Sequence, residues 1–528
     1  MKRWGPLLLL CSVFVLYVLT TPTLYVIGDP YDELQFVLSG EPVLRSYHLL
    51  TTVLYRSGAM LLSWLPGAVM LHLEVLVIAA ALFGVWAVFR TAGKGTEGLL
   101  TGGILAVSYG FWLHGSTIET GMPALAALTG AVLAAVLSQR EEGVSPGWRD
   151  SAAPGRLRAS AALLFTLSVL LHVQHVVLLP AMLVLLLPGW KGRDALRIAG
   201  RMLLLIILVA GGTYLAAGAG VFGLTDFAAF WSWLTTHHNQ ESLAHLRFGP
   251  IAVARSLSGL LRLFVDIGGA GTAVRGMLTG EGLAAFGVQQ AVRLAAAAAA
   301  VVLLGWWSWK GRNEAPRMLT AAVVAAVSLL VFNSFWLGSD PQFWLGLLPF
   351  LLPLSAAGMR TMRRRWLAMA SAGGLILLLL GANLDTREPS LLFPDGDDAH
   401  SQAELFRTRY AGALVLTPGS RWTSALISMN ADIDVRQMFK ADPSVDLIAH
   451  LDRVTDSTLR RGDAVYVEGL EHVPPEMVGI WESVESLFGI SREEYHAHLR
   501  EMYRLEPVTL RGEGDVDLEM FRLHPRRI

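Results

Sequence analysis

Cysteine is almost absent from this sequence, and charge is scarce. The one cysteine, Cys11, lies inside an apolar run, so the chain can form neither an internal disulfide nor a cysteine-based metal site. Charged residues make up 16% of the chain, against about 25% in an average globular domain. The net charge is −1, and no basic block suited to nucleic acid occurs. A disulfide scaffold and a nucleic-acid partner are therefore not expected.

Hydrophobic residues dominate instead. They make up 53% of the 528 residues, and the mean hydropathy is +0.48, so a soluble protein is not expected. The first apolar run follows Lys2 and Arg3 and extends to about Ile27, which is too long for the core of a cleaved signal peptide. We expect an uncleaved first membrane span with a cytoplasmic N-terminus.

Apolar runs of span length predict an all-α, multi-pass membrane region with about eleven spans before residue 385. With this count, every short loop rich in Lys and Arg falls on one side of the membrane. The count requires the block 161–190 to form two short spans joined at His172-Val173-Gln174-His175. Segment 47–65 is expected to be an interfacial or re-entrant helix. The expected spans are the run to residue 27, 70–89, 99–112, 118–137, the two in 161–190, 202–221, 283–309, 319–337, 343–358 and 366–383.

The composition changes at about residue 385, after which charges are frequent and no span occurs. Short β-like runs at 413–416, 464–467 and 518–523 alternate with helical patterns at 422–429, 475–488 and 491–503. This pattern predicts a small α/β domain. We expect two domains, a membrane domain over 1–384 and an extracytoplasmic domain over 385–528.

Polar residues of the membrane region gather on the expected external side, and the spans carry almost no ionisable group near mid-depth. A transporter usually places its polar site near the membrane midplane, on broken helices. The distribution here favours a cavity at the external surface. The residues concerned are the eight histidines His48, His72, His114, His172, His175, His237, His238 and His245, and the acids Asp29, Asp32, Glu33, Glu119, Asp226 and Asp340.

The stretch GDPYDELQFVLSGEP, residues 28–42, directly follows the first span. Asp32-Glu33, then Phe36, Ser39-Gly40 and Pro42, resembles the first external loop of the GT-C glycosyltransferases, above all of the protein O-mannosyltransferase and aminoarabinose-transferase branches. The resemblance covers roughly residues 1–385. It implies an enzyme that moves a sugar from a polyprenyl-phosphate donor to a protein, lipid or glycan acceptor on the external face, with no organic cofactor. A bacterial inner membrane is the expected location.

Inverting sugar transfer needs a carboxylate that takes the acceptor proton. The resemblance implies a catalytic first loop over 28–48, with Asp32, at the head of the acidic pair, as the base. Asp29 with Glu33 fits a wider spacing that also occurs in the family, so both remain candidates. Glu119 is similar to the family's second external acidic position; alternatively, it is a first-turn carboxylate of a helix capped by Ser116 or Thr117.

Several residues are candidates for contacts with the phosphate or the sugar. His172 and His175 resemble the family's polar tip between two short spans; their spacing, with no third ligand nearby in sequence, does not support a divalent metal site. His237-His238 lies in an aromatic loop and would stack on a sugar or belong to an interfacial belt. Arg255 and Arg262 share a helix face and would bind the lipid phosphate or lie at headgroup level. The other candidates are His48, Arg56, His114 and Asp340.

Two other function classes fit a multi-pass chain. A membrane transporter or lipid-linked-sugar flippase would place its site at mid-depth and use alternating access. A membrane scaffold would use the external domain to bind a partner. Only the enzyme requires Asp32 and Glu119 to converge in one outward cavity.

Overall fold

The structure of this chain is a computed structural model. It describes residues 4–21, 33–34, 37, 48–65, 69–93, 95–118, 120–142, 153–187, 193–221, 223–235, 249–267, 288–335, 340–384, 398–419, 423, 426, 433–438, 446–470, 481, 484–485, 488–511 and 517–526. The chain forms two compact units. The first contains 1–21, 40–65 and 71–388, and the second contains 389–528 together with 22–39 and 66–70.

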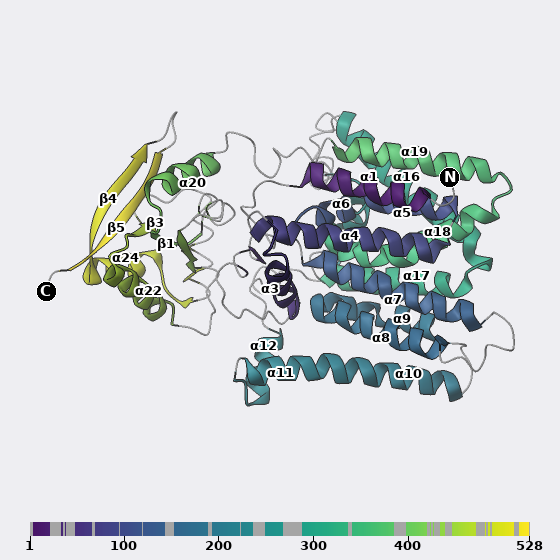
Figure 1. The fold of residues 1–528 in the computed structure, drawn as a ribbon, viewed down its shortest axis with the longest axis horizontal. Coiled ribbons are helices and arrows are strands. Elements are labelled where there is room, and N and C mark those ends of the chain that lie inside the picture. Colours follow the sequence, from purple (N-terminus) through teal and green to yellow (C-terminus); the bar gives the residue numbers. More distant parts are fainter. Residues whose placement is uncertain are drawn as a thin grey trace. The chain divides into compact units, whose positions relative to one another are not determined.

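The first unit is a bundle of long helices (Figure 1). Its first helices are α1 (Gly5–Thr20), α3 (Thr51–Leu61), α4 (Val69–Ala92), α5 (Thr96–Val107) and α6 (Tyr109–Gly115). They are followed by α7 (Gly121–Glu142), α8 (Ala153–Leu171), η3 (Val173–Leu178), α9 (Leu179–Leu186), α10 (Arg193–Ile206), η4 (Ile207–Gly211), α11 (Gly212–Gly220) and α12 (Phe227–Thr235). The last are α14 (Pro250–Arg262), α16 (Val288–Lys310), η6 (Gly311–Asn313), α17 (Pro316–Phe335), η7 (Pro341–Leu347), α18 (Leu348–Thr361) and α19 (Arg365–Leu384).

Seven described helical segments are long and apolar enough to cross a membrane. They are α4, α7, α10 to α11, α16, α17, η7 to α18, and α19; α1, α5 and η3 to α9 are shorter apolar segments. Within the described residues each expected span is largely helical, with 99–112 divided between α5 and α6, but the expected total of eleven is not reached by length and composition. The amphipathic α3 lies where an interfacial or re-entrant helix was expected, burying Tyr55 and exposing Leu54 and Met60.

Helices satisfy the backbone of an apolar chain because every interior N–H and C=O is bonded within the segment. Hydroxyl side chains within these helices are satisfied in the same way. Thr91, Thr129, Thr166 and Ser334 donate to the carbonyl oxygen four residues earlier, at 2.7 to 2.8 Å. These polar residues are therefore compatible with an apolar environment.

Small residues allow α16 and α18 to approach closely. A Cβ on Gly358 would overlap the carbonyl oxygen of Trp307, and one on Gly311 would lie 2.6 Å from the carbonyl oxygen of Leu354. The hydroxyls of Ser308 and Ser355 are 3.0 Å apart across the same contact. Contacts of this kind are typical of helices packed within membranes.

The second unit contains a mixed five-stranded sheet. Its strands are β1 (Leu414–Thr417), β2 (Asp434–Gln437), β3 (Val465–Glu468), β4 (Tyr503–Arg511) and β5 (Asp517–Pro525), in the order β2-β1-β3-β5-β4. β1 is parallel to β2 and β3, whereas β5 is antiparallel to β3 and β4. The accompanying helices are α20 (Asp398–Arg409), α22 (Leu447–Arg461) and α24 (Arg492–Met502).

The three predicted strand runs and the last predicted helical pattern occur as β1, β3, β5 and α24. β2, β4, α20 and α22 were not predicted, and the patterns at 422–429 and 475–488 lie largely outside the described residues. α24 starts with a capping box between Ser491 and Glu494. The N-cap of α22 is Asp446, whose carboxylate accepts from the amide of Ala449, and its C-cap is Gly462, with φ +87°.

Candidate functional site

Three buried histidines lie together at one end of the helix bundle. α8 ends at Leu171; His172 lies between α8 and η3, and His175 lies within η3. His48 comes from the segment just before α3. The three side chains are 5 to 7% exposed. We call His48, His172 and His175 the histidine cluster.

The segment that carries His48 is hydrogen-bonded to the end of α8. The amide of Leu50 donates to the carbonyl oxygen of Leu170 at 3.1 Å. The Thr51 hydroxyl donates to the carbonyl oxygen of Leu171 at 2.8 Å, and His48 Nδ1 lies 3.3 Å from the same oxygen. Because a carbonyl only accepts, Nδ1 of His48 carries a proton.

The other side of the His48 ring faces α7 and the turn after α8. Its Nε2 is 3.4 Å from the hydroxyl of Thr120, the residue before α7. In the neutral ring this nitrogen accepts the hydroxyl proton. The rings of His48 and His172 meet edge to face, with centroids 4.6 Å apart. His48 therefore joins the ends of α7 and α8.

His172 is positioned by the start of η7. Its Nε2 lies 3.2 Å from Nε2 of Gln342, the side-chain amide nitrogen. The backbone N–H of Gln342 donates to Oδ1 of Asp340 at 2.9 Å, which makes Asp340 the N-cap of η7. An amide N–H donates, so Nε2 of a neutral His172 accepts and Nδ1 carries the proton. That buried Nδ1 has no hydrogen-bond partner among the described residues.

His175 completes the cluster. Its ring stacks on His172 with centroids 5.6 Å apart, and its Nδ1 is hydrogen-bonded to the hydroxyl of Ser168. The side-chain amides of Gln174 and Asn333 both donate to the carbonyl oxygen of Phe343, at 2.9 and 3.2 Å. These bonds fix η7 against η3 and α17, so the cluster rests on helix ends rather than on a loose loop.

Of the other predicted site residues that the structure describes, some lie beside this cluster, some form contacts with other residues, and two lie on α14 and α3. His114, on α6, is 3% exposed and close enough to His172 to interact with it electrostatically. Asp340 uses one oxygen as the N-cap described above. Arg262 forms an ion pair with Asp266 at 3.3 Å. Arg255 is exposed on α14, and Arg56 is half-buried on α3.

The acidic candidates are described only in part. Glu33 is fully buried, so its carboxylate is not a solvated surface group. The other predicted acidic and aromatic-loop residues lie outside the described residues: Asp29, Asp32, Glu119, His237 and His238. In the described part of the chain, no group of three or more His, Cys, Asp or Glu side chains is arranged to hold a metal ion.

Four polar residues of the site were missed by the sequence reasoning: Thr51, Thr120, Ser168 and Gln342. Periodicity and loop charge show where helices end, but not which ends meet. One local signal was present at Gln342, because it follows Asp340-Pro341, an N-cap and a first-turn proline.

No protein-family model matches the sequence, and no curated protein matches it either. Among solved structures, the fold is similar to that of the aminoarabinose transferase ArnT from Cupriavidus metallidurans in the apo state. The TM-score is 0.61 and the identity 10%, over 98% of this chain and 97% of that chain. The chain has the GT-C fold.

Other GT-C structures are also similar. ArnT from the same organism bound to undecaprenyl phosphate has a TM-score of 0.58 and 10% identity, over 99% of this chain and 98% of that chain. The archaeal oligosaccharyltransferase AglB from Archaeoglobus fulgidus, in complex with an inhibitory peptide and a dolichol-phosphate, has a TM-score of 0.48 and 11% identity, over 96% of this chain and 73% of that chain. The expectation of a GT-C architecture is confirmed at the level of the fold.

Proposed function

We propose that this chain is an integral membrane glycosyltransferase that moves a sugar from a polyprenyl-phosphate donor to a protein, lipid or glycan acceptor. The similarity in fold to ArnT, over 98% of this chain and 97% of that one, carries the proposal. ArnT also has a structure bound to undecaprenyl phosphate, a lipid phosphate of the proposed donor class. The buried Glu33 and the histidine cluster supply polar groups of the kinds that such a reaction uses.

In the proposed topology the chain crosses a bacterial inner membrane eleven times, through α1, α4, α5 to α6, α7, α8, η3 to α9, α10 to α11, α16, α17, η7 to α18, and α19. The N-terminus is cytoplasmic, and the domain after residue 384 lies outside. The basic loops support this orientation. The histidine cluster then lies at the external membrane surface, where a lipid-linked donor presents its phosphate.

The proposed reaction is an inverting displacement at the anomeric carbon of the donor sugar. Asp32 or Asp29 takes the proton of the acceptor hydroxyl while its oxygen attacks that carbon. The bond from the carbon to the phosphate oxygen breaks, and its electron pair leaves with the polyprenyl phosphate. Glu33 and Glu119 support the base by orienting the acceptor.

The proposed role of the histidine cluster is to hold the donor phosphate or sugar. The Nδ1–H of His172 is a buried donor whose ring is fixed by Gln342, so it would need no reorganisation to stabilise developing negative charge. His48, His114 and His175 line the same region. Asp340 acts through Gln342 as a positioning residue, while Arg56, Arg255, Arg262, His237 and His238 are proposed as further substrate contacts.

The proposal is tested by sugar transfer with the purified protein in detergent, using a panel of radiolabelled polyprenyl-phosphate sugars. Wild type is compared with Asp32→Asn and Asp29→Asn at equal folded amounts. Transfer by wild type that is lost in one of the two variants assigns the base. Unchanged turnover in both variants removes the first external loop from the chemistry.

A further inference from the structure

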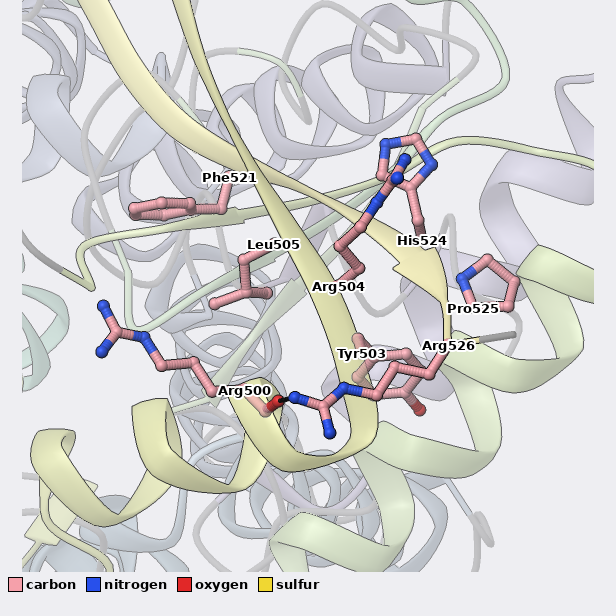
Figure 2. Close-up of a pocket in the computed structure, with 8 residues that line it drawn as sticks. All are labelled: Arg500, Tyr503, Arg504, Leu505, Phe521, His524, Pro525 and Arg526. Carbon is pink, nitrogen blue, oxygen red and sulfur yellow. Dashed lines mark hydrogen bonds between the residues drawn. The ribbon is translucent and has the colours of Figure 1, made fainter. Parts of the chain in front are cut away.

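A cavity of about 950 Å³ lies within the second unit, beside the strand pair β4 and β5 (Figure 2). Its ionisable lining other than Tyr503 is entirely basic: Arg500 at the end of α24, Arg504 on β4, His524 on β5, and Arg526 just after β5. No residue that the structure places in the lining carries a carboxylate. The cavity belongs to the second unit, whereas the histidine cluster belongs to the first, and the proposed transfer assigns no role to the residues of the cavity.

The cavity lies at the edge of the sheet. β4 is an outer strand. Arg504 pairs with His524 in the strand register, so their side chains lie on the same face of the sheet. Tyr503 and Leu505 alternate with Arg504 and lie on the opposite face. Because side chains of both faces line the cavity, the cavity extends around the edge strand.

The hydrogen bonds near the cavity hold two of its basic groups in place. The guanidinium of Arg526 donates to the backbone oxygen of Arg500, as Figure 2 shows. His524 Nε2 lies 2.6 Å from Oε2 of Glu506, a residue outside the lining. Arg504 is exposed. Positive charge therefore faces solvent on three exposed arginines, Arg500, Arg504 and Arg526.

The remaining lining is apolar or uncharged. Figure 2 shows Phe521, Leu505 and Pro525 alongside the basic side chains. The Tyr503 hydroxyl donates to Asp456 at 3.0 Å, and burial together with this bond raises the pKa of Tyr503, so the hydroxyl stays neutral. The cavity thus combines cationic donors with an aromatic and aliphatic wall.

We propose that this cavity binds a phosphate ester. A guanidinium presents paired N–H donors that match two oxygens of a phosphate, and several arginines together can engage all of its oxygens. Phe521, Leu505 and Pro525 contact the organic part of the ligand. The site recognises the phosphate ester either in a soluble metabolite or in a phospholipid headgroup, because both present the same group.

A simpler role exists for the same residues. An edge strand is protected against pairing with other chains by charged side chains and by proline, and β4 carries Arg504, Glu506 and Pro507. Protection of the edge needs no ligand, so a binding measurement separates the two roles.

The test uses the full-length protein in a neutral detergent and isothermal titration calorimetry. The probes are glycerol phosphate and dihexanoyl phosphatidylglycerol, with glycerol and dihexanoylglycerol, which carry no phosphate, as controls. Arg504→Gln and Arg526→Gln remove one cavity cation each. Arg453→Gln, on the exposed surface of α22 in the same domain, is the matched control.

Wild type and Arg453→Gln are expected to bind at least one phosphate probe, and each cavity variant to bind it about tenfold more weakly, because a charge-assisted hydrogen bond is lost. Binding of glycerol phosphate identifies a soluble ester as sufficient, whereas binding of phosphatidylglycerol alone identifies a lipid headgroup. The proposal is overturned if neither probe binds, or if both cavity variants bind as wild type does. This readout does not depend on sugar transfer.

Discussion

At the scale of single residues, the hydrogen bonds of the histidine cluster join parts of the chain that are far apart in sequence. His48 contacts Leu171 and Thr120, and Gln342 contacts His172. A buried polar group left without a partner costs about 1–3 kcal/mol. Each of these bonds therefore favours the one arrangement in which the ends of α7, α8 and η7 meet.

The role of Asp340 can be tested by two substitutions. Asp340→Asn keeps a side-chain oxygen that accepts from the backbone N–H of Gln342. Asp340→Ala removes this N-cap of η7, which is worth about 1 kcal/mol. If Asp340 only positions Gln342, the Asn variant should transfer sugar within about twofold of wild type and the Ala variant several-fold more slowly. Equal loss in both variants would show that the negative charge itself is required.

His172 should matter for transfer beyond its role in packing. We expect His172→Ala to lower kcat/KM about a hundredfold, the usual effect of removing a preorganised donor to developing charge. His72→Ala is the matched control. His72 is as buried as His172, at 5% exposed, and its ring is hydrogen-bonded to the carbonyl oxygen of Leu65 at 3.1 Å. Steady-state kinetics and thermal unfolding are measured for both variants. Equal kinetic losses would contradict a specific role for His172.

The residues of this site were predictable to different degrees. His172 and His175 were predicted to lie where two short spans meet, because the positive-inside rule requires the apolar block 161–190 to turn back. The structure places His172 between α8 and η3, and His175 in η3. Thr120 and Gln342 were not found, because their partners come from helices that are distant in sequence. Side-chain pairing across helix ends is a property of packing, and one sequence carries no direct record of it.

At the scale of helices and strands, the close packing of α16 against α18 depends on Gly358. Gly305, on α16, serves as the matched control. Gly358 lies against the backbone of Trp307, whereas no described atom lies within 4 Å of where a Cβ on Gly305 of α16 would stand. Gly358→Ala should lower stability by about 1–3 kcal/mol through overpacking. Gly305→Ala should raise it by up to about 1 kcal/mol, because alanine is the better helix former. Thermal unfolding in detergent measures both; equal shifts would contradict the close helix contact.

The strands of the second unit show which elements a pattern can predict. β1, β3 and β5 coincide with apolar or alternating runs and were predicted. β2 has the sequence Asp-Val-Arg-Gln, with one apolar residue, and forms only because β1 pairs with it. β4 contains Pro507, which argues against a central strand but is tolerated at the edge that β4 occupies.

At the scale of the whole molecule, the proposed orientation places the second unit outside and the loop between α16 and α17 inside. The single Cys11 makes this testable by labelling with a membrane-impermeant maleimide in spheroplasts. In a Cys11→Ser background, Ser457→Cys should label from outside, and Asn313→Cys only after the membrane is permeabilised. Ser457 is exposed on α22, and Asn313 is exposed in η6. Labelling of both sites from the same side would contradict the topology.

The central claim is that a lipid phosphate carries the sugar. In the most direct measurement, the purified protein is incubated with the same radiolabelled sugar linked either to a polyprenyl phosphate or, separately, to a nucleoside diphosphate. The radiolabel in the acceptor fraction is then measured. We expect label to be transferred from the lipid donor alone. Transfer from the nucleotide donor alone, or from neither donor across the panel of sugars, would contradict the account.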